Sequence, residues 1–496
     1  MSDYDILSII PPLVAISLAL ITKNVIISLF LSVFIGFSIL AGGNIFVGFT
    51  NILEKGIFEQ MIGKSNAQVM ALMIIIGGFI ALIEKSGIAR TFANTITKKI
   101  NTKSKAQVAT WLGGLIIFFT DSGNSLILGP LFQPIYDRLK ISKQKLAYIL
   151  DSTSSPVCIL IPFIGWGIYI MSLIQQEFSK LGIAEHEFTA FIKTLPYQFY
   201  PICTLLLVPL IAITGKDFGP MAKAELLVES STDISYVKTK LDNNKENAGP
   251  SMASFIVPFV VLFVVMFSMF TYFGFPVKPV PGIKLRISMG TAYLLATFTS
   301  FYFIYKEKIM SFKEAFNTYI EGMQKMVYVL IILVLAWSLG SVCSQLQTSV
   351  FLTSIAKNFI TAGMLPFFVF VIGCIVSFST GTSWGTFAIM MPIAIPMAYS
   401  LGAPIYATIG AVLGGGLFGD HCSPVSDTTI LSSMASKCDL VDHVITQLPY
   451  ALTAALGAMI AYVVAGFVQS PITLIIAIAS SVILLFVFKN VWKVRD

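Results

Sequence analysis

The chain has 496 residues, of which 56% are hydrophobic and 11% are charged, and its mean hydropathy is +0.84. Soluble globular proteins carry about 25% charged residues, so this composition excludes that class and predicts an all-α protein that crosses a membrane many times. The net charge of +7 does not indicate a nucleic-acid partner, because the Lys and Arg residues are scattered through the connections between apolar stretches. The 6 cysteines lack the spacing of metal sites and are predicted to be buried thiols.

Apolar stretches long enough to span a bilayer follow one another along most of the chain. A transmembrane helix needs about 20 mostly apolar residues. The predicted transmembrane helices, about 11 by this criterion, are residues 6–22, 25–42, 68–86, 145–170, 195–215, 253–275, 287–305, 325–344, 404–434, 447–468 and 470–488. Two further stretches, 105–137 and 364–399, are apolar but have polar centres.

These two stretches are predicted to be re-entrant helical hairpins. The first contains Thr-Asp-Ser-Gly-Asn-Ser at 120–125, and the second contains Ser-Thr-Gly-Thr-Ser at 379–383. A Pro-x-x-x-Pro pair follows each polar centre. Polar groups and glycine at this depth suit two half-helices joined at a polar tip better than one continuous helix.

The hairpins also mark an internal repeat. Phe-Thr-Asp-Ser-Gly at 119–123 resembles Phe-Ser-Thr-Gly-Thr at 378–382, and each hairpin precedes a span interrupted at a Ser-Pro pair. The predicted parts of the chain are N-terminal transmembrane helices (1–44), a first repeat (45–215), a hydrophilic cytoplasmic connector (216–250), linking transmembrane helices (251–304), a second repeat (305–470) and a C-terminal helix (471–496).

Basic residues predict the orientation of the repeats, because Lys and Arg gather on the cytoplasmic side of membrane proteins. The basic residues that flank the first hairpin are Arg90, Lys98, Lys99, Lys103, Lys105, Arg138, Lys140, Lys143 and Lys145. Both ends of this hairpin are therefore predicted to face the cytoplasm, and counting spans onward puts the ends of the second hairpin outside. In inverted repeats of this kind, substrate and ion sites lie near the membrane midplane at broken helices.

The predicted breaks supply the carboxylates and oxygen ligands that sodium and protons require. The candidate cation- and substrate-binding residues are Asp121, Asn124, Ser125, Asp151, Ser152, Thr153, Ser155, Thr380, Thr382, Ser383, Asp420, His421, Ser423, Ser426 and Asp427. Among them, Asp420, Asp427 and Asp151 are the candidates for direct contact with sodium. Burial favours the protonated form of a carboxylate and a bound cation favours its charged form, so one group can hold either cation at different times. His421 adds a group that titrates near neutral pH.

Each candidate also has a structural interpretation. Asp420 and Asp427, seven residues apart, would share a helix face in a continuous helix, or could act as a cap or a buried pair. Hydroxyls at the breaks can simply satisfy freed backbone groups. Trp166 and Trp384 fit ordinary helix packing, and Glu84, at the end of a span, is predicted to lie at the membrane interface.

A family resemblance emerges from the longest motif. The run Gly-Asp-His-Cys-Ser-Pro-Val-Ser-Asp-Thr-Thr-Ile-Leu-Ser-Ser at 419–433 resembles the signature of the NhaC family of sodium/proton antiporters, and Gly-Thr-Ser-Trp-Gly-Thr at 381–386 resembles that family's preceding motif. The resemblance implies membership of the ion transporter superfamily, with inverted repeats, paired hairpins and an elevator-type mechanism. It also implies a multi-pass protein of the bacterial cytoplasmic membrane, in a family whose members often form homodimers.

The predicted function is secondary active exchange of sodium for protons across that membrane. No Walker-type nucleotide loop is present, and the chain is not predicted to be an enzyme or to use a cofactor beyond the transported sodium and protons. The predicted partners are the lipid bilayer and these cations. The alternative is a sodium- or proton-coupled carrier or exchanger of a small organic anion, of the malate/lactate type, or of an amino acid. A membrane-embedded hydrolase that pairs His421 with a Ser or Cys is a more distant alternative.

Overall fold

The computed structural model describes residues 4–89, 100–230, 250–278, 280–356 and 361–492. These residues form helices joined by turns and contain no β-strand, so the predicted all-α class is confirmed. Within the described ranges, 10 helices are long and apolar enough to cross a membrane, or up to 11 if α2 (Val25–Leu40) and the bent segment Ile45–Ile62 count as one span.

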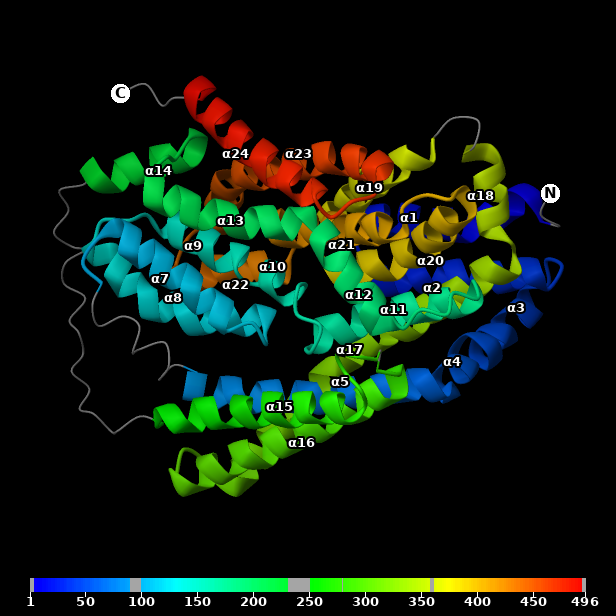
Figure 1. Cartoon of the computed structure of the whole chain (residues 1–496), viewed down its shortest axis with the longest axis horizontal. Helices are drawn as coiled ribbons and strands as arrows, with labels where there is room; N and C mark the ends of the chain where they lie inside the picture. The colour runs from blue at the N-terminus through cyan, green and yellow to red at the C-terminus, as the bar shows by residue number, and fades with distance from the viewer. Residues whose placement is uncertain (1–3, 90–99, 231–249, 279, 357–360, 493–496) are drawn as a thin grey trace.

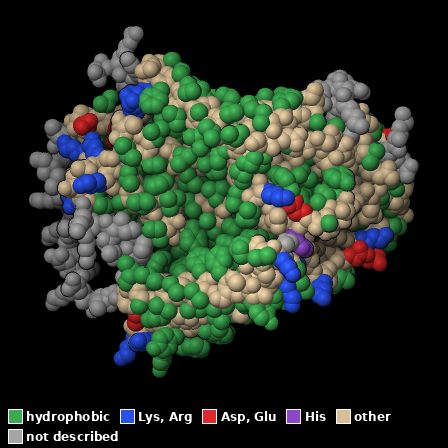
Figure 2. All heavy atoms as spheres, viewed as in Figure 1, with side chains coloured by type: hydrophobic (Ala, Val, Ile, Leu, Met, Phe, Trp, Pro, Cys, Tyr) green, Lys and Arg blue, Asp and Glu red, His purple; other side chains and the backbone are tan. Residues whose placement is uncertain are grey.

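The surface is that of a protein surrounded by lipid. Figure 2 shows a broad apolar band on the viewed face, with most Lys, Arg, Asp and Glu side chains to either side of it. Large apolar side chains are exposed on the peripheral helices, and only 17% of the apolar window of α24 (Thr473–Val491) is buried inside the protein. A bilayer removes such surface from water, and helices satisfy their own backbone groups there.

The first predicted hairpin is present and consists of α7 (Lys103–Ile116) and α8 (Asp121–Arg138). Thr120 ends the turn by accepting a hydrogen bond from the backbone N–H of Gly123 at 3.0 Å, which caps α8. The cap explains why the second arm begins at Asp121 rather than one turn earlier.

The second hairpin consists of α19 (Leu365–Thr380) and α20 (Ser383–Leu401). Gly381 ends α19 with φ of +66°, a left-handed conformation that glycine adopts without steric cost. In Figure 1 the first hairpin extends from the left edge toward the centre, and the second approaches from the opposite side. Their tips meet, because Asp121 and 380–382 line the same cavity.

Both interrupted spans are broken at the predicted Ser-Pro pairs. In the second repeat, α21 (Ile405–Cys422) and α22 (Asp427–Ser436) are separated by a turn at 423–426. In the first repeat, α9 (Lys143–Ser152) is followed by the single turn α10 (Ser155–Cys158) and then by α11 (Gly165–Lys180). The single span predicted at 145–170 is therefore wrong in its extent, since the apolar run hides a wide break before Gly165.

The first two predicted spans form a third helical hairpin. A short 3₁₀ turn (Asp5–Ile9) leads into α1 (Ile10–Thr22), and α2 begins two residues after Lys23. The turn reaches the hairpin tips, because Lys23 and Val25 line the cavity that also contains residues 380–382. Gly385 allows this approach, since a Cβ there would lie 2.3 Å from the Val25 side chain.

A layer of long helices packs along one edge of the molecule (Figure 1) and includes α5 (Lys64–Lys85), α15 (Met252–Tyr272), α16 (Gly282–Lys306) and α17 (Phe312–Gln345). Ser311 and Glu314 form a capping box that starts α17. The span predicted at 325–344 is therefore too short, and Lys325 lies 13 residues inside the helix.

The remaining long helices are α13 (Phe199–Thr214) and α23 (Leu440–Val468), which pack against each other and against α24. The shorter elements, which the hydropathy pattern does not predict, are α3 (Ile45–Asn51), a π-helical segment (Ile52–Phe58), α4 (Glu59–Ile62), α12 (Glu187–Thr194), a 3₁₀ turn (Leu195–Tyr197), α14 (Gly219–Ser230), α18 (Thr348–Ala356) and a 3₁₀ turn (Ala362–Met364).

Two predictions about polar segments change. The connector predicted at 216–250 begins with α14, while residues 231–249 lie outside the described residues. Arg90, Lys98 and Lys99 also lie outside the described residues.

Lys145, predicted as a surface flank of the first hairpin, is buried in an ion pair with Asp217. A buried lysine of this kind is compensated by its partner and carries no signal about orientation.

Candidate functional site

Asp420 is the centre of a buried polar site at the end of α21, where its side chain is 3% exposed. Its Oδ2 accepts a hydrogen bond from Ser383 Oγ at 2.9 Å, and its Oδ1 accepts one from Ser426 Oγ at 3.1 Å. Ser155 lies beside the same carboxylate, and its Oγ has no hydrogen-bond partner within the described residues. These four residues, Asp420, Ser383, Ser426 and Ser155, are called the Asp420 cage.

The cage is assembled from three of the predicted breaks. Ser383 begins α20 at the second hairpin tip, Ser426 immediately precedes α22, and Ser155 lies at the break of the first repeat. The sequence therefore places hydroxyls of both repeats around one carboxylate. Broken helices are suited to this role, because they leave polar groups free at membrane depth.

Glycines hold α21 against the second hairpin and so position Asp420. A Cβ at Gly419 would lie 2.0 Å from the backbone nitrogen of Phe378, and a Cβ at Gly415 would lie 2.6 Å from the carbonyl oxygen of Phe370. Ser377 Oγ joins the same helices, since it donates to Gly415 O at 2.7 Å and accepts from Gly419 N at 3.0 Å. Glycine at these two positions therefore lets the helix backbones approach closely.

The cage has the chemistry of a site for a hard monovalent cation. It offers one carboxylate and hydroxyl oxygens, which are the ligand types that such cations prefer. Ser383 Oγ also lies 3.3 Å from Gly416 O, and Ser426 Oγ lies 3.1 Å from Thr428 Oγ1. Both hydroxyls can therefore turn their hydrogens to another acceptor and present lone pairs to an ion. No three His, Cys, Asp or Glu side chains converge in the described ranges as they would for a transition metal.

Asp427, predicted beside Asp420, has a different environment. It is exposed, begins α22, and accepts a hydrogen bond from the backbone N–H of Thr428 at 2.9 Å. The turn at 423–426 directs it into a cavity of about 480 Å³ between the hairpin tips. The two carboxylates do not share a helix face, although Asp427 is close enough to act on Asp420 electrostatically.

This central cavity is bounded by all three helical hairpins. Its polar and aromatic lining residues include Lys23, Lys325, Asp121, Ser122, Thr380, Thr382, Trp384, Tyr328 and Asp427. Asp121 and Thr382 were predicted as cation ligands, and they face this cavity, with no hydrogen bond to Asp420 among the described residues. An adjoining cavity of about 150 Å³ shares Asp121, Lys325 and Trp384 and is also lined by Glu84 and Trp166.

Two assignments made on position alone leave out polar contacts. Trp166 does more than pack, because its Nε1 donates to Asp121 Oδ2 at 3.1 Å and its ring lies 4.8 Å from that of Trp384. Glu84, predicted at the membrane interface, accepts a hydrogen bond from Thr120 Oγ1 at 2.6 Å and lines the adjoining cavity. Both residues belong to the walls of the polar centre.

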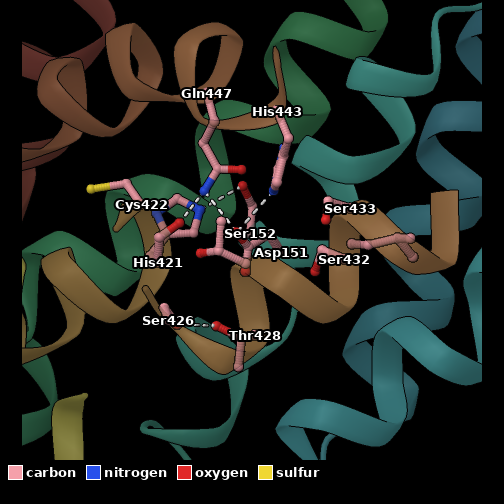
Figure 3. Close-up of polar contacts among 12 residues, drawn as sticks. Asp151, Ser152, His421, Cys422, Ser426, Thr428, Ser432, Ser433, His443 and Gln447 are labelled. Carbon is pink, nitrogen blue, oxygen red and sulfur yellow. Dashed lines mark hydrogen bonds and ion pairs between the residues drawn. The ribbon is translucent and has the colours of Figure 1, made fainter. Parts of the chain in front are cut away.

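Asp151 lies in a second buried network, which Figure 3 draws together with His421, His443 and Gln447. Its Oδ2 is 3.1 Å from His443 Nε2 and accepts from Gln447 Nε2 at 2.9 Å, and the close-up shows both α23 side chains pointing toward it. His421 contacts Ser152 Oγ through Nε2 at 2.9 Å and Tyr200 OH through Nδ1 at 2.7 Å. Protein donors therefore occupy one oxygen of Asp151, whereas Oδ1 has no partner within the described residues.

The other predicted ligands hold the breaks together. Asn124 Nδ2 donates to Thr153 O at 2.9 Å and joins the first hairpin to the end of α9, while Thr153 Oγ1 donates to Ile149 O at 2.8 Å. Ser423 Oγ donates to Phe378 O at 2.7 Å. These contacts fit the structural interpretation, in which hydroxyls and amides satisfy freed backbone groups.

Two further predicted hydroxyls have protein partners of the same kind. Thr380 Oγ1 donates to Val376 O at 2.9 Å, as hydroxyls inside helices commonly do. Ser125 Oγ pairs with Ser154 Oγ at 3.2 Å and with Ser432 Oγ at 2.8 Å, and so joins the first hairpin to α22. Neither hydroxyl contacts the Asp420 cage.

Sequence reasoning missed His443, Gln447, Tyr200, Lys23 and Lys325 as parts of the polar centre. Polar residues four apart at the start of α23 are a signal for His443 and Gln447, since they share a helix face inside an apolar segment. The predicted span 325–344 begins at Lys325, because the preceding turns of α17 are too polar for the apolar window. Lys23 lies between the predicted spans 6–22 and 25–42, where a polar residue predicts only a connection.

A multi-pass helical protein whose facing hairpins and broken helices enclose a buried carboxylate has the architecture of a membrane transporter. The solved structure of the YdaH transporter of Alcanivorax borkumensis shares this fold, with a TM-score of 0.60 and 14% identity over 86% of this chain and 89% of that one. The sequence profile of the Na+/H+ antiporter family matches residues 4–162 and 157–467, so the chain belongs to that family. The predicted family resemblance is confirmed.

Two curated relatives extend this result. An uncharacterized protein of Haemophilus influenzae is 34% identical over 498 residues, which cover 96% of this chain and 94% of that protein. The malate-2H(+)/Na(+)-lactate antiporter of Bacillus subtilis is 40% identical over 97 residues, which cover only 20% of this chain and 21% of that protein. The profile match makes the chain a member of a sodium-coupled antiporter family, and the structural comparison shows that a transporter shares its fold.

Proposed function

We propose that this protein exchanges sodium for protons across the cytoplasmic membrane of a bacterium, with Asp420 binding either cation in turn. The observation that carries the proposal is the Asp420 cage, a single buried carboxylate to which hydroxyls of Ser383 and Ser426 donate. An isolated charge at membrane depth costs several kcal/mol, so Asp420 is stable there when a proton or a bound cation neutralises it.

Exchange follows if the hairpins reorient only when the carboxylate is neutralised. Sodium and a proton then compete for one site, and each releases the other on opposite sides of the membrane. The cage is suited to such a step because its ligands come from both repeats, so relative movement of the repeats changes its access. The family and the bacterial relatives support the location in a bacterial membrane.

Flux through purified protein in liposomes, with sodium as the only varied solute, tests the proposal. A sodium gradient should drive proton movement in the opposite direction, and Asp420→Asn should remove this flux because the amide cannot exchange a proton for a cation. Asp442→Asn is a matched control, since Asp442 is exposed in the first turn of α23. Sodium-driven proton flux that persists in Asp420→Asn would exclude Asp420 as the exchange site.

A second candidate is exchange in which a small organic solute moves with the ions. The Bacillus subtilis relative is named for malate and lactate, and a shared segment of 97 residues supports the comparison. The observation that favours this candidate is the central cavity, whose volume of about 480 Å³ far exceeds the space of one ion. Supplying organic acids or amino acids to the same liposomes separates the two candidates.

A further inference from the structure

We propose that the central cavity binds the carboxylate of a small α-hydroxy or α-amino acid through the ammonium groups of Lys325 and Lys23. The inference rests on the proposed exchange, since it assigns the organic substrate of the same transport centre. It names a site separate from the Asp420 cage and a chemical class for its ligand.

Lys325 is the first of the two lysines that line the proposed site. It lies 13 residues after the start of the 34-residue helix α17, which places it about 20 Å along a membrane-spanning helix. It lines both the central and the adjoining cavity. Lys325 is exposed and lies where the apolar part of α17 begins, and a lysine that lines a cavity beside a membrane-spanning segment marks a substrate path or a partner charge.

Neither lysine of the cavity has a carboxylate partner in the described part of the chain. The ion pairs there involve other lysines, one arginine and His443. Lys23 has a left-handed φ of 53° between two half-helices, and the turn brings it to the tips of both other hairpins. Two ammonium groups therefore line one cavity without forming a salt bridge in the described residues, and the carboxylates of Asp121 and Asp427 line it with them.

The cavity carries charges of both signs, because Lys23 and Lys325 line it together with Asp121 and Asp427. A small ligand that carries a carboxylate and a second polar group can pair with both kinds of side chain, and such attraction is stronger in a protein than in bulk water. The N-terminal ends of α8 and α20 also reach the cavity at Asp121 and Thr382, and their backbone dipoles favour negative charge.

The acidic and hydroxyl side chains of the cavity lining explain the second polar group of the proposed ligand. Asp427 and Asp121 line the cavity together with the hydroxyl-bearing Thr382. Their oxygens can accept hydrogen bonds from an α-hydroxyl or an α-ammonium group. Trp384 and Tyr328 add aromatic surface to the cavity lining. A volume of about 480 Å³ lies within the usual range of small-molecule pockets, which is about 300 to 1,000 Å³.

Occupancy of this site is linked to occupancy of the cage. Asp427 directly follows Ser426, whose hydroxyl donates to Asp420 at 3.1 Å, so a cation held by Asp420 lowers the negative potential in the cavity that Asp427 lines. A carboxylate then binds beside the lysines with less repulsion from the acidic wall. Sodium and the organic acid should therefore bind with positive cooperativity.

Tryptophan fluorescence of the purified full chain in saturating sodium tests the site directly, because Trp384 lines the cavity. The probes are L-lactate, L-malate and L-alanine, with L-lactamide and L-alaninamide as matched compounds that lack the carboxylate. We expect at least one acid to bind and its amide to bind far more weakly. Lys325→Gln should weaken that binding about tenfold or more, and Lys325→Arg should restore most of it. Lys313→Gln, on the exposed first turns of the same helix, should bind as the unchanged protein does.

The binding measurement tests this site, whereas the liposome flux measurement tests the proposed exchange. Absence of binding by all three acids, equal binding of acids and amides, or unchanged binding in Lys325→Gln would each overturn the carboxylate site. If Lys325→Gln does not fold, Lys23→Gln decides by the same comparison. Acid binding that is retained when wild-type protein shows no sodium-driven proton flux would overturn the exchange while supporting this site. Labelled lactate and alanine then distinguish the hydroxy acid from the amino acid.

Discussion

Asp420 and Asp427 are seven residues apart in one motif, yet they lie in two different environments. Asp420 is 3% exposed and accepts hydrogen bonds from Ser383 and Ser426, whereas Asp427 is exposed to a cavity that also contains two lysines. The turn at 423–426 separates them. The comparison shows that a single break in a helix can place the two carboxylates of one acidic motif in a buried hydroxyl cage and in an open cavity, which are the proposed cation and substrate sites.

The largest expected effect separates these two carboxylates. Asp420→Asn should weaken sodium binding about 1,000-fold, because a charge pair at about 4 Å contributes about 4 kcal/mol at the effective dielectric of a protein. Asp427→Asn should weaken it about tenfold, because the cavity leaves that charge better solvated. Sodium-dependent protection against thermal unfolding in detergent measures both. Equal losses in the two variants would show that the carboxylates form one site.

A third carboxylate sharpens the comparison, because Asp151 is as buried as Asp420 but accepts hydrogen bonds from His443 and Gln447. Asp151→Ala should lower the free energy of unfolding by about 3 kcal/mol, since it leaves buried donors without an acceptor. Asp151→Asn keeps an acceptor of the same shape and should cost less. The measurement is thermal unfolding of both variants in one detergent. An Ala variant as stable as the Asn variant would exclude this structural role.

The sequence predicts the hairpins and the breaks well, because glycine, proline and polar residues inside apolar segments have local causes. The tip predicted at 379–383 encloses the observed turn at 381–382, whereas the first observed turn, at 117–120, lies N-terminal to most of the tip predicted at 120–125. It predicts Asp420, Ser383 and Ser426 as candidate ligands, which the structure brings together. It could not separate them from other hydroxyls such as Ser423, because that choice depends on which way each break turns.

What sequence reasoning missed depends on contacts between distant segments. Lys23 and Lys325 are more than 300 residues apart, and only the packing of the hairpin α1–α2 against α17 and α20 brings them to one cavity. Lys145 shows the opposite case, because a basic residue that looks exposed is buried by its pairing with Asp217. Charge alone, without its partner, does not reveal depth in the membrane.

A smaller effect tests the side chains that define the cage. Ser383→Ala should weaken sodium binding about tenfold, because it removes one oxygen ligand and a hydrogen bond to Asp420. Ser423→Ala is the matched control, since its hydroxyl donates to a backbone carbonyl instead. That variant should lose about 1 kcal/mol of stability and keep its sodium affinity. Sodium titration and thermal unfolding of both proteins give the four values needed. If Ser423→Ala bound sodium more weakly than Ser383→Ala, then Ser423 and not Ser383 would be assigned as the sodium ligand.

The smallest expected change in sodium affinity concerns Asp121, which lines the central cavity. Trp166→Phe removes the hydrogen bond to Asp121 Oδ2 and keeps an aromatic ring against Trp384. Because Asp121 faces the cavity and has no hydrogen bond to the cage within the described residues, sodium affinity should change less than about threefold, while stability falls by about 1 kcal/mol. Sodium titration of Trp166→Phe and of Ser383→Ala under the same conditions measures the difference in affinity. A loss as large as that of Ser383→Ala would mean that Asp121 is a sodium ligand, and the two environments would then be one.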